Sequence, residues 1–456
     1  MIYSLLLPII RMAIRIYFRK IDVIGSENLP KKGAAIYIVN HPSALLDPLV
    51  VATLAGRQLH FIAAAEYFGK KIKSWFFQKQ FNMIPVYRPK IHTSENVNND
   101  HMFLHCFNTL DNGGVIIIFP EGNSETEKRL RKLKTGVVRM VLGAEKRNGI
   151  KVPIFPIGIN YTNPHRFQSD VFVSIGKPIL LDHRIDPDDK QGVIKQTSIV
   201  EEKLKEHIIH IDDEHLETTI QRIEQIFAKQ LQQNLGISNK ELTRKFTVAK
   251  DVINAVEYFE SKSPDSTKSI YKIIGKYYKI IEDLPMHGRL LNHINSKRNF
   301  SDYLIIIFLF PVFLFGFLVN SIPYYFSSKV FKNKYLKRIK GEDLEHQIRP
   351  VFSGSIAFGI GTMFFIVWYI LLGIISIVFF PWWWGIIFLF ASYWTGYFTL
   401  KYLGVLRRVI ERSKLKNVTI NHPAKMKELI LLRGEIIDEL KKFSEKYRSK
   451  DNKANG

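Results

Sequence analysis

The feature that most constrains how this chain can fold is a run of fifty residues, 351–400, that contains no Asp, Glu, Lys or Arg. About 20 apolar residues span the hydrocarbon core of a bilayer, so this run is long enough for two membrane passes. Pro381 stands within the run, and the three tryptophans that follow it are typical of a membrane interface, so we expect a turn there. The alternative, an unusually hydrophobic core of a soluble domain, is disfavoured by the length of the run.

A second apolar stretch at residues 303–318 leaves the number of membrane passes open. A full pass near 303–325 would move the N-terminal region to the other side of the membrane from the C-terminal tail. Pro311, Gly316 and Pro323 would allow a re-entrant or kinked element instead.

Basic residues flank these apolar stretches. The connector at 326–350 and the tail at 401–456 are both rich in Lys and Arg, and the positive-inside rule places both in the cytoplasm. We therefore predict an integral membrane protein with a transmembrane region at 299–400, a basic helical tail at 401–456 and a hairpin at about 353–400.

The first twenty residues combine apolar side chains with arginine. Arg11, Arg15 and Arg19 recur every four residues and so share one face of a helix. A signal peptide would place its charges before the apolar stretch, which is not the order here. We predict an amphipathic helix over residues 1–20 that lies in the membrane interface with its arginines at the lipid phosphates. A helix packed on its own domain is the alternative.

The composition narrows the class of protein. A net charge of +23 indicates polyanionic partners: nucleic acid, an anionic membrane surface or phosphorylated substrates. Hydrophobic residues at 46% exclude intrinsic disorder. The single cysteine, Cys106, excludes an intramolecular disulfide and any multi-cysteine metal site. No group of His, Asp or Glu has persuasive metal-ligand spacing, so no metal site is predicted.

Residues 21–190 show the pattern of an α/β domain. Short apolar runs typical of buried strands occur at residues 34–39, 115–119 and 154–159. A helix is expected at 133–148, ending before Gly149. We predict a mainly parallel sheet flanked by helices, followed by a charged helical extension at 191–298.

Polar residues follow the first of these strands. Asn40 and His41 come directly after it, and Asp47 lies six residues beyond His41. A carboxylate that accepts a hydrogen bond from Nδ1 would fix the tautomer of the histidine and leave Nε2 as a general base. The alternative is a loop histidine and an aspartate that caps a helix beginning at Pro48.

Three further segments could contact a ligand. After the second strand, Gly122 would let the backbone approach an anion, and Glu121 could accept hydrogen bonds from substrate hydroxyls. A basic run at 128–134 follows, which could equally be a solvated helix face. Arg88 ends a short predicted strand, and its planar guanidinium suits a phosphate, although it could be a surface residue. The proline-bounded strand at 152–156 could line an acyl-chain pocket or simply be core.

Together these segments resemble the four sequence blocks of the glycerolipid acyltransferases, the enzymes that acylate glycerol-3-phosphate or lysophosphatidate. The matching residues are Asn40, His41 and Asp47 in the first block, Ile84, Pro85, Val86 and Arg88 in the second, Phe119, Pro120, Glu121 and Gly122 in the third, and Val152, Pro153 and Pro156 in the fourth. The resemblance covers residues 20–185 and is nearest to the fungal-type glycerol-3-phosphate acyltransferases.

This chain departs from the family pattern at three places. The step from His41 to Asp47 is one residue longer than the usual H-x-x-x-x-D, a spacing shared with the fungal-type enzymes. The second block lacks its leading glycine. Asn123 stands where an arginine often follows the third block.

The resemblance implies a membrane-bound O-acyltransferase that moves a fatty acyl group from an acyl thioester to a hydroxyl of glycerol-3-phosphate, an early step of phospholipid synthesis. In this scheme His41 is the general base, Asp47 orients it, and the catalytic domain faces the cytoplasm. Substrate binding falls to Asn40, Arg88, Glu121, Gly122 and Lys134, and the acyl-chain pocket to Val152, Pro153, Phe155 and Pro156. No cofactor is implied: acyl-CoA or acyl-carrier protein is the donor substrate, and the other partners are membrane lipids and the phosphorylated acceptor.

Other functions fit parts of the same pattern. Lysophosphatidate or another lysolipid could be the acceptor, and a non-catalytic lipid-binding membrane protein would carry a similar domain. Nucleic-acid binding has only the net charge in its favour, since the sequence shows no zinc finger, clear helix-turn-helix or RNA-binding signature. A serine hydrolase is disfavoured because no G-x-S-x-G motif is present.

Overall fold

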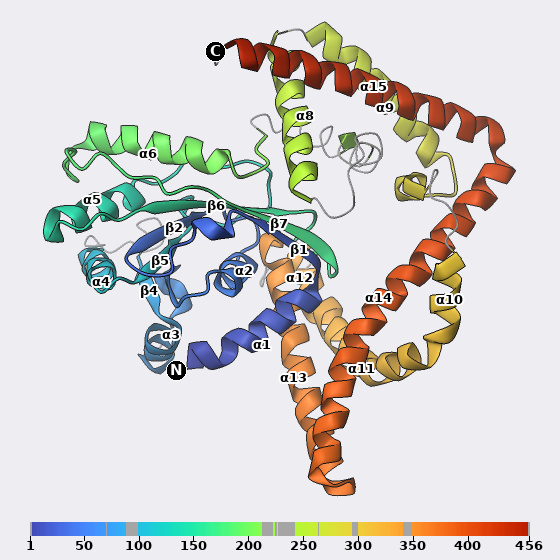
Figure 1. The fold of residues 1–456 in the computed structure, drawn as a ribbon, viewed down its shortest axis with the longest axis horizontal. Helices are drawn as coiled ribbons and strands as arrows, with labels where there is room; N and C mark the ends of the chain where they lie inside the picture. The colour runs from blue at the N-terminus through green and yellow to red at the C-terminus, as the bar shows by residue number, and fades with distance from the viewer. Residues whose placement is uncertain are drawn as a thin grey trace. The chain divides into compact units, whose positions relative to one another are not determined.

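The computed structural model describes residues 2–69, 71–87, 99–211, 222–223, 226, 242–262, 264–293, 300–340 and 349–454. The chain divides into two compact units (Figure 1). Unit 1 comprises Met1–His210 and Val330–Ile360, and unit 2 comprises Ile211–Lys329 and Gly361–Gly456. The boundary after Ile360 falls inside one continuous helix, α13 (Ser353–Phe379), so the first residues of this apolar helix belong to unit 1.

Unit 1 is built on a seven-stranded sheet with the strand order β1-β7-β6-β2-β5-β3-β4. Neighbouring strands are parallel except for β6 and β7, which are antiparallel. The strands are β1 (Phe18–Ile24), β2 (Ala35–Val39), β3 (Leu59–Ala64), β4 (Met83–Val86), β5 (Val115–Ile118), β6 (Ile154–Tyr161) and β7 (Ser169–Ile175). The central strand β2 is buried at every position, as expected for a parallel strand that is covered on both faces.

Helices cover both faces of this sheet, and each face has its own core. On one face, α1 (Ile2–Tyr17) and α2 (Leu46–Leu54) pack with Tyr37 and Val39 of β2. On the other face, Ile36 and Ile38 pack with a second group of helices. These are α4 (Asp100–Asp111), α5 (Gly136–Asn148) and α6 (Lys190–Lys205). Successive strand residues point to opposite faces, which explains why β2 contributes alternately to the two cores.

The predicted α/β fold with a mainly parallel sheet is confirmed. The apolar runs predicted as strands are β2, β5 and β6, and α5 ends where expected because Gly149 follows it in a left-handed conformation (φ 67°). The N-terminal helix is shorter than expected: it ends at Tyr17, and the next residues form β1, which pairs with β7.

Unit 2 is helical. The helices α8 (Leu242–Lys262), α9 (Pro264–Glu282) and α15 (Pro423–Ala454) pack around one core, so the C-terminal tail packs against the charged extension. Apolar helices form the rest of this unit: α10 (Phe300–Phe308), α11 (Phe310–Val330), the part of α13 after residue 360, and α14 (Trp382–Asn421). The remaining elements among the described residues are η1 (Ser26–Asn28), η2 (Ala65–Tyr67), α3 (Lys71–Phe81), η3 (Gly288–His293), the π-helix η4 (Phe331–Leu336), α12 (Lys337–Ile339) and η5 (Pro350–Phe352).

Two helical segments are long and apolar enough to cross a membrane: Phe310–Ile339 and Pro350–Phe379. In the most apolar 18 residues of each segment, only 17% and 11%, respectively, are buried by the rest of the protein. Such exposed apolar helices indicate that the chain associates with a membrane. Pro381 separates α13 from α14, at the position where the sequence predicted a turn. Asn320 of α11 donates to the Ser392 carbonyl and accepts from the Tyr369 hydroxyl, so a polar side chain joins three apolar helices.

Candidate active site

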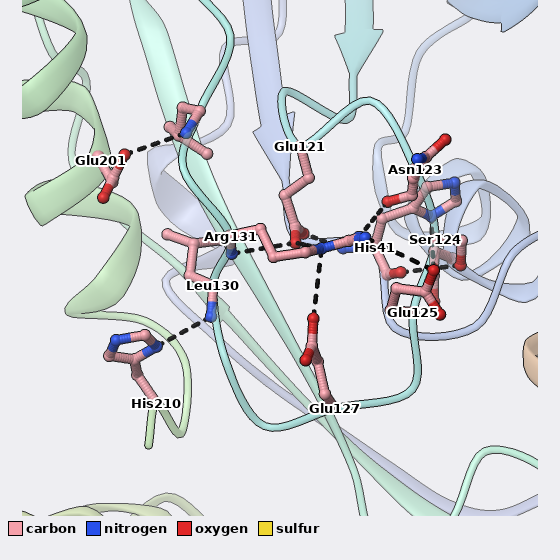
Figure 2. Close-up of polar contacts among 12 residues, drawn as sticks. His41, Glu121, Asn123, Ser124, Glu125, Glu127, Leu130, Arg131, Glu201 and His210 are labelled. Carbon is pink, nitrogen blue, oxygen red and sulfur yellow. Dashed lines mark hydrogen bonds and ion pairs between the residues drawn. The ribbon is translucent and has the colours of Figure 1, made fainter. Parts of the chain in front are cut away.

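The two polar loops of unit 1 lie beside each other because the strands that precede them are parallel neighbours. Ile38 of β2 pairs with Ile118 of the parallel strand β5, so the loops that follow these two strands both start at the carboxyl edge of the sheet. The loop that begins at Asn40 therefore lies against the loop that begins at Phe119 (Figure 2). Ligands of open α/β sheets bind at this edge, where strands end and helices begin.

His41 and Asp47 form a hydrogen-bonded pair in this loop. The His41 Nδ1 lies 2.7 Å from the Asp47 Oδ2, and the aspartate side chain is fully buried while the histidine side chain is 19% exposed. Because the carboxylate can only accept, Nδ1 carries the proton that it shares with Asp47. The other ring nitrogen, Nε2, is then the lone-pair acceptor, which is the state that a general base requires.

A helix start explains how two residues six apart come together. Ala44 adopts a left-handed conformation (φ 45°), and α2 begins shortly after it, at Leu46. With Leu45 as the residue between Ala44 and the helix, this turn brings Asp47, in the first turn of α2, back toward His41. The alternative of a capping aspartate does not describe the geometry, because α2 starts before Asp47 and the carboxylate accepts from Ser43 N (2.8 Å) outside the helix.

Asp47 accepts a third hydrogen bond that the sequence analysis did not anticipate. The Tyr161 hydroxyl, from the end of β6, donates to the Asp47 Oδ1 at 2.8 Å. Burial raises the pKa of Tyr161, and the adjacent Asp47 charge adds to this, so the hydroxyl keeps its proton and stays a donor. With His41, Ser43 and Tyr161 all donating to it, the buried carboxylate is held in one orientation.

Phe119 fixes the plane of the histidine ring. The two rings stack with centroids 4.0 Å apart and an angle of 20° between their planes. One face of the imidazole is thus covered by the first residue of the F-P-E-G segment. The Nε2 lone pair lies in the plane of the ring, so a reacting hydroxyl can approach Nε2 along the ring edge while Phe119 covers one face.

Glu121 supports the backbone of His41 rather than standing free. Its Oε1 accepts from His41 N at 2.8 Å, and its Oε2 accepts from the N and Nε of Arg131 at 3.3 and 3.1 Å (Figure 2). The side chain is 4% exposed, and this burial raises its pKa while the hydrogen bonds and the Arg131 charge oppose the rise. Both oxygens are engaged by protein donors, so contact with a substrate hydroxyl would add to these bonds or replace one.

Arg131 is a site residue that the sequence analysis assigned to a solvated basic run. It pairs with Glu121 and, at 3.3 Å, with Glu127, and its guanidinium donates to the Asn123 carbonyl. Glu125 lies 3.8 Å away. The sequence signal that could have located it is the cluster of glutamates that precedes it, which needs a nearby positive charge.

Gly122 and Lys134 are brought together as a possible anion site. Gly122 has a left-handed conformation (φ 77°), and a β-carbon placed there would lie 2.2 Å from the Lys134 Nζ. The left-handed backbone favours glycine at this position, and the absence of a side chain lets the Lys134 ammonium lie directly over the turn. Asn40 instead faces β6: its amide donates to the Ile159 carbonyl and accepts from Ile159 N, at 3.0 and 2.7 Å.

The residues assigned to an acyl-chain pocket are not gathered on one surface. Val152 lies in the core shared with α4, α5 and α6, whereas Phe155 lies in the core shared with α1 and α2 and meets Tyr37 edge-on. Pro156 is buried and Pro153 is partly exposed. Arg88 lies outside the described residues. Among the side chains that the structure describes, no group of three or more His, Cys, Asp or Glu is arranged to hold a metal ion.

The polar centre at the end of the parallel strands thus consists of the buried Asp47 carboxylate, the His41 imidazole and the Lys134 ammonium beside Gly122. Residues 20–160 match the sequence model of the acyltransferase family.

Individual relatives cover more of the chain than the family model does. Glycerol-3-phosphate O-acyltransferase 1 of Saccharomyces cerevisiae is 22% identical over 291 residues, which are 60% of this chain and 38% of that protein. The chloroplastic 1-acyl-sn-glycerol-3-phosphate acyltransferase LPAT1 of Arabidopsis thaliana is 29% identical over 37% of this chain and 46% of its own length. The chain thus spans less than half of either relative.

One solved structure is also similar. The 1-acyl-sn-glycerophosphate acyltransferase PlsC of Thermotoga maritima aligns with 43% of this chain and 76% of its own, with 20% identity and a TM-score of 0.32.

Proposed function

We propose that this protein is a membrane-bound glycerolipid acyltransferase that transfers a fatty acyl group from an acyl thioester to a hydroxyl of glycerol-3-phosphate, an early step of phospholipid synthesis. The observation that carries the proposal is the His41–Asp47 pair, held with Nε2 as acceptor at the carboxyl edge of an acyltransferase-family sheet. The yeast relative supports glycerol-3-phosphate as the acceptor.

The chemistry follows from the proton positions in the pair. His41 Nε2 takes the proton of the acceptor hydroxyl as its oxygen attacks the thioester carbonyl, and Asp47 stabilises the imidazolium that forms. The new C–O ester bond forms, the C–S bond breaks, and the imidazolium returns its proton to the leaving thiolate. No covalent acyl-enzyme is required, because donor and acceptor react directly.

Substrate positions are assigned to the residues around this pair. Lys134, over the Gly122 turn, contributes positive charge for the acceptor phosphate, and Arg88 is the second proposed phosphate ligand. Asn40 and Glu121 shape the loop that receives the glycerol part, since both already hold backbone atoms there. Of the segment at 152–156, only the partly exposed Pro153 is kept as a proposed neighbour of the acyl chain, because Val152 and Phe155 are buried in the two cores. The donor is acyl-CoA or acyl-carrier protein.

The membrane arrangement completes the proposal. We assign residues 1–20 to the membrane interface, 21–190 to the catalytic domain on the cytoplasmic side, 191–298 to a helical extension, 299–400 to the transmembrane region and 401–456 to a basic tail. Exposed apolar residues on α1 support the first assignment: Leu5 is 71% exposed, and Ile9 and Met12 are exposed on the same side. Of the arginines, Arg11 donates to the Thr53 carbonyl and Arg19 pairs with Asp170, so both also anchor α1 and β1 to the domain.

The acceptor is tested by transfer assays with the purified full chain in lipid vesicles. Labelled acyl-CoA and acyl-carrier protein are each paired with glycerol-3-phosphate and with lysophosphatidate. The proposal predicts lysophosphatidate as the main product from glycerol-3-phosphate. Faster acylation of lysophosphatidate would favour the second candidate, which is supported by the similarity to the 1-acyl-sn-glycerol-3-phosphate acyltransferase of Arabidopsis. Binding of these lipids without transfer by either donor would favour a non-catalytic lipid-binding protein.

A further inference from the structure

The first residues of the apolar helix α13, together with the short turn before it, pack on the His41 loop. We call residues 349–358 the lead segment. It lies outside the region matched by the family model, and more than 300 residues of sequence separate it from the loop that it touches. Both parts belong to unit 1.

The most direct contact is with the loop backbone. The Ser355 hydroxyl donates to the Ser43 carbonyl at 3.0 Å, and both residues are buried. Ser43 N in turn donates to Asp47. The lead segment is therefore bonded to the carbonyl of the residue whose own amide donates to the candidate catalytic carboxylate.

A second contact reaches the loop through two side chains. Gly354 N donates to the Nδ1 of His165 at 3.2 Å, and the Nε2 of His165 lies 3.0 Å from the Thr126 hydroxyl, which donates to the Pro42 carbonyl. Burial lowers the pKa of His165, which favours the neutral ring that this chain of donors and acceptors requires. His165 therefore accepts at Nδ1 and donates at Nε2.

A third contact joins the lead segment to the loop after β5. The Arg349 guanidinium donates to the Ser124 carbonyl and to the Glu125 carboxylate. The Ser124 hydroxyl donates to the His41 carbonyl and accepts from Ala44 N. Ser124 thus bonds to His41 and Ala44 of the loop, and Arg349 of the lead segment bonds to Ser124.

Apolar packing also holds the lead segment against the rest of unit 1. Val351, Ser355 and Phe358 are buried at the spacing of one helical face, and Phe358 meets Tyr17 edge-on with centroids 5.6 Å apart. A β-carbon on Gly354 would lie 2.4 Å from the Pro164 carbonyl oxygen and 3.1 Å from a methyl group of Leu46. Glycine is therefore required at 354. At Gly359, five residues further along α13, the same β-carbon meets nothing within 4 Å.

We propose that the lead segment is a positioning element for the candidate catalytic loop, so that the acyltransferase domain is completed by the start of the apolar helix α13. The inference rests on the proposed function for its kinetic consequence, but the ordering of the loop can be measured without activity. It assigns Gly354, Ser355 and Arg349 to the positioning of His41 and Asp47, with no contact to substrate.

The test compares Gly354→Ala with its matched control, Gly359→Ala, in the full-length protein in lipid vesicles. Amide hydrogen exchange is read at residues 41–47, where the His41, Ser43 and Ala44 amides are hydrogen-bonded in the structure. We expect faster exchange at 41–47 in Gly354→Ala, unchanged exchange in the strands β2 and β5, and wild-type exchange throughout in Gly359→Ala. Equal exchange at 41–47 in the two variants would overturn the proposal, whether or not the protein is active.

Kinetics supply the second readout. In Gly354→Ala we expect kcat to fall about 10- to 100-fold with little change in KM for either substrate, because the loop shift misplaces the base and leaves the substrate contacts. If Gly354→Ala does not fold, Ser355→Ala replaces it: losing one hydrogen bond should lower kcat about fivefold and speed exchange at 41–47. Its control is Ser376→Ala, whose hydroxyl bonds only within α13, to the Leu372 carbonyl.

The two failures are distinguishable. A wild-type protein that transfers no acyl group to any acceptor contradicts the proposed function, while the exchange comparison still decides the role of the lead segment. If the wild type is active but Gly354→Ala equals Gly359→Ala in both kcat and amide exchange, the result contradicts the positioning role of the lead segment and leaves the proposed function standing.

Discussion

The loop between β2 and α2 and the strand β6 differ in what surrounds their side chains, although family blocks mark both. In the loop, the polar atoms of His41 and Asp47 are held by donors and acceptors from several elements, and the histidine keeps a partly exposed face. Val152, just before β6, and Phe155, within it, are buried in cores on opposite faces of the sheet. A family block at the end of a strand can carry chemistry, whereas a block within a strand is first constrained by packing.

The largest effect expected within this comparison is that of Asp47→Asn. The asparagine side chain has one acceptor oxygen in place of two, so it cannot accept from His41, Ser43 and Tyr161 in the same way. If its N–H group faces Nδ1 of His41, the imidazole must accept there, which favours the tautomer with the proton on Nε2. We expect kcat to fall on the order of 10³- to 10⁴-fold, measured as labelled product formed per minute. Asp170→Asn, which removes only a surface pair with Arg19, is the control and should keep wild-type kcat.

Glu121→Gln should have the next largest effect. One of the glutamine atoms must be an N–H that faces either the His41 amide or Arg131, so one hydrogen bond is replaced by two opposed donors. We expect kcat to fall about 100-fold because the His41 backbone shifts. Glu127→Gln is a matched control, since Glu127 also pairs with Arg131 but does not touch His41. If the two variants lose equal activity, the loss comes from the ion pairs of Arg131 and not from the hydrogen bond between Glu121 and the His41 amide.

Tyr161→Phe removes a single donor to Asp47 and leaves the ring in place. A hydrogen bond to a charged group contributes about 1.5–3 kcal/mol, so kcat should fall about tenfold or somewhat more, with KM unchanged. The control is Tyr37→Phe: this tyrosine is in the same sheet, and its buried hydroxyl has no hydrogen-bond partner in the part of the chain that the structure describes. Equal kinetics of Tyr161→Phe and the wild type would remove Tyr161 from the positioning of Asp47.

The smallest effect on activity is expected in β6. Phe155→Leu should lower the free energy of unfolding by about 1 kcal/mol because of the cavity left in the core, with kcat and KM close to wild type. Phe119→Leu has the same change in side chain but removes the ring that stacks on His41, and should lower kcat several-fold. Thermal unfolding and steady-state kinetics on both variants decide the comparison. A raised KM for the acyl donor in Phe155→Leu alone would instead support an acyl-chain pocket at β6.

Local sequence patterns located the strands β2, β5 and β6, and the family blocks indicated the candidate base. The runs that became β2, β5 and β6 are short and fully apolar, and Gly149 ends α5 by a property of glycine alone. The pairing of His41 with Asp47 was predicted from the family blocks, because both residues lie in one loop and its adjoining helix. The fold class therefore followed from the apolar runs, and the candidate catalytic pair from the resemblance to the family blocks.

The supporting contacts could not be predicted in the same way, because they join distant parts of the sequence. Tyr161 lies 114 residues from Asp47, and Ser355 lies 312 residues from Ser43. In the sequence Arg131 is one residue of a basic run, whereas in the structure it lies within ion-pair distance of Glu121, Glu125 and Glu127. Hydrophobic periodicity describes only neighbours along a helix or strand, so it contains no information about which loops a folded sheet places side by side.

The most direct test of the central claim is the rate of acyl transfer by His41→Ala. Transfer from acyl-CoA and from acyl-carrier protein to glycerol-3-phosphate is measured beside the wild type, together with the fraction of protein in the membrane and the thermal unfolding midpoint. We predict that the variant loses transfer while its membrane association and midpoint remain those of the wild type. Turnover close to the wild-type rate in a folded, membrane-bound His41→Ala protein would contradict the claim that the His41–Asp47 pair carries the reaction.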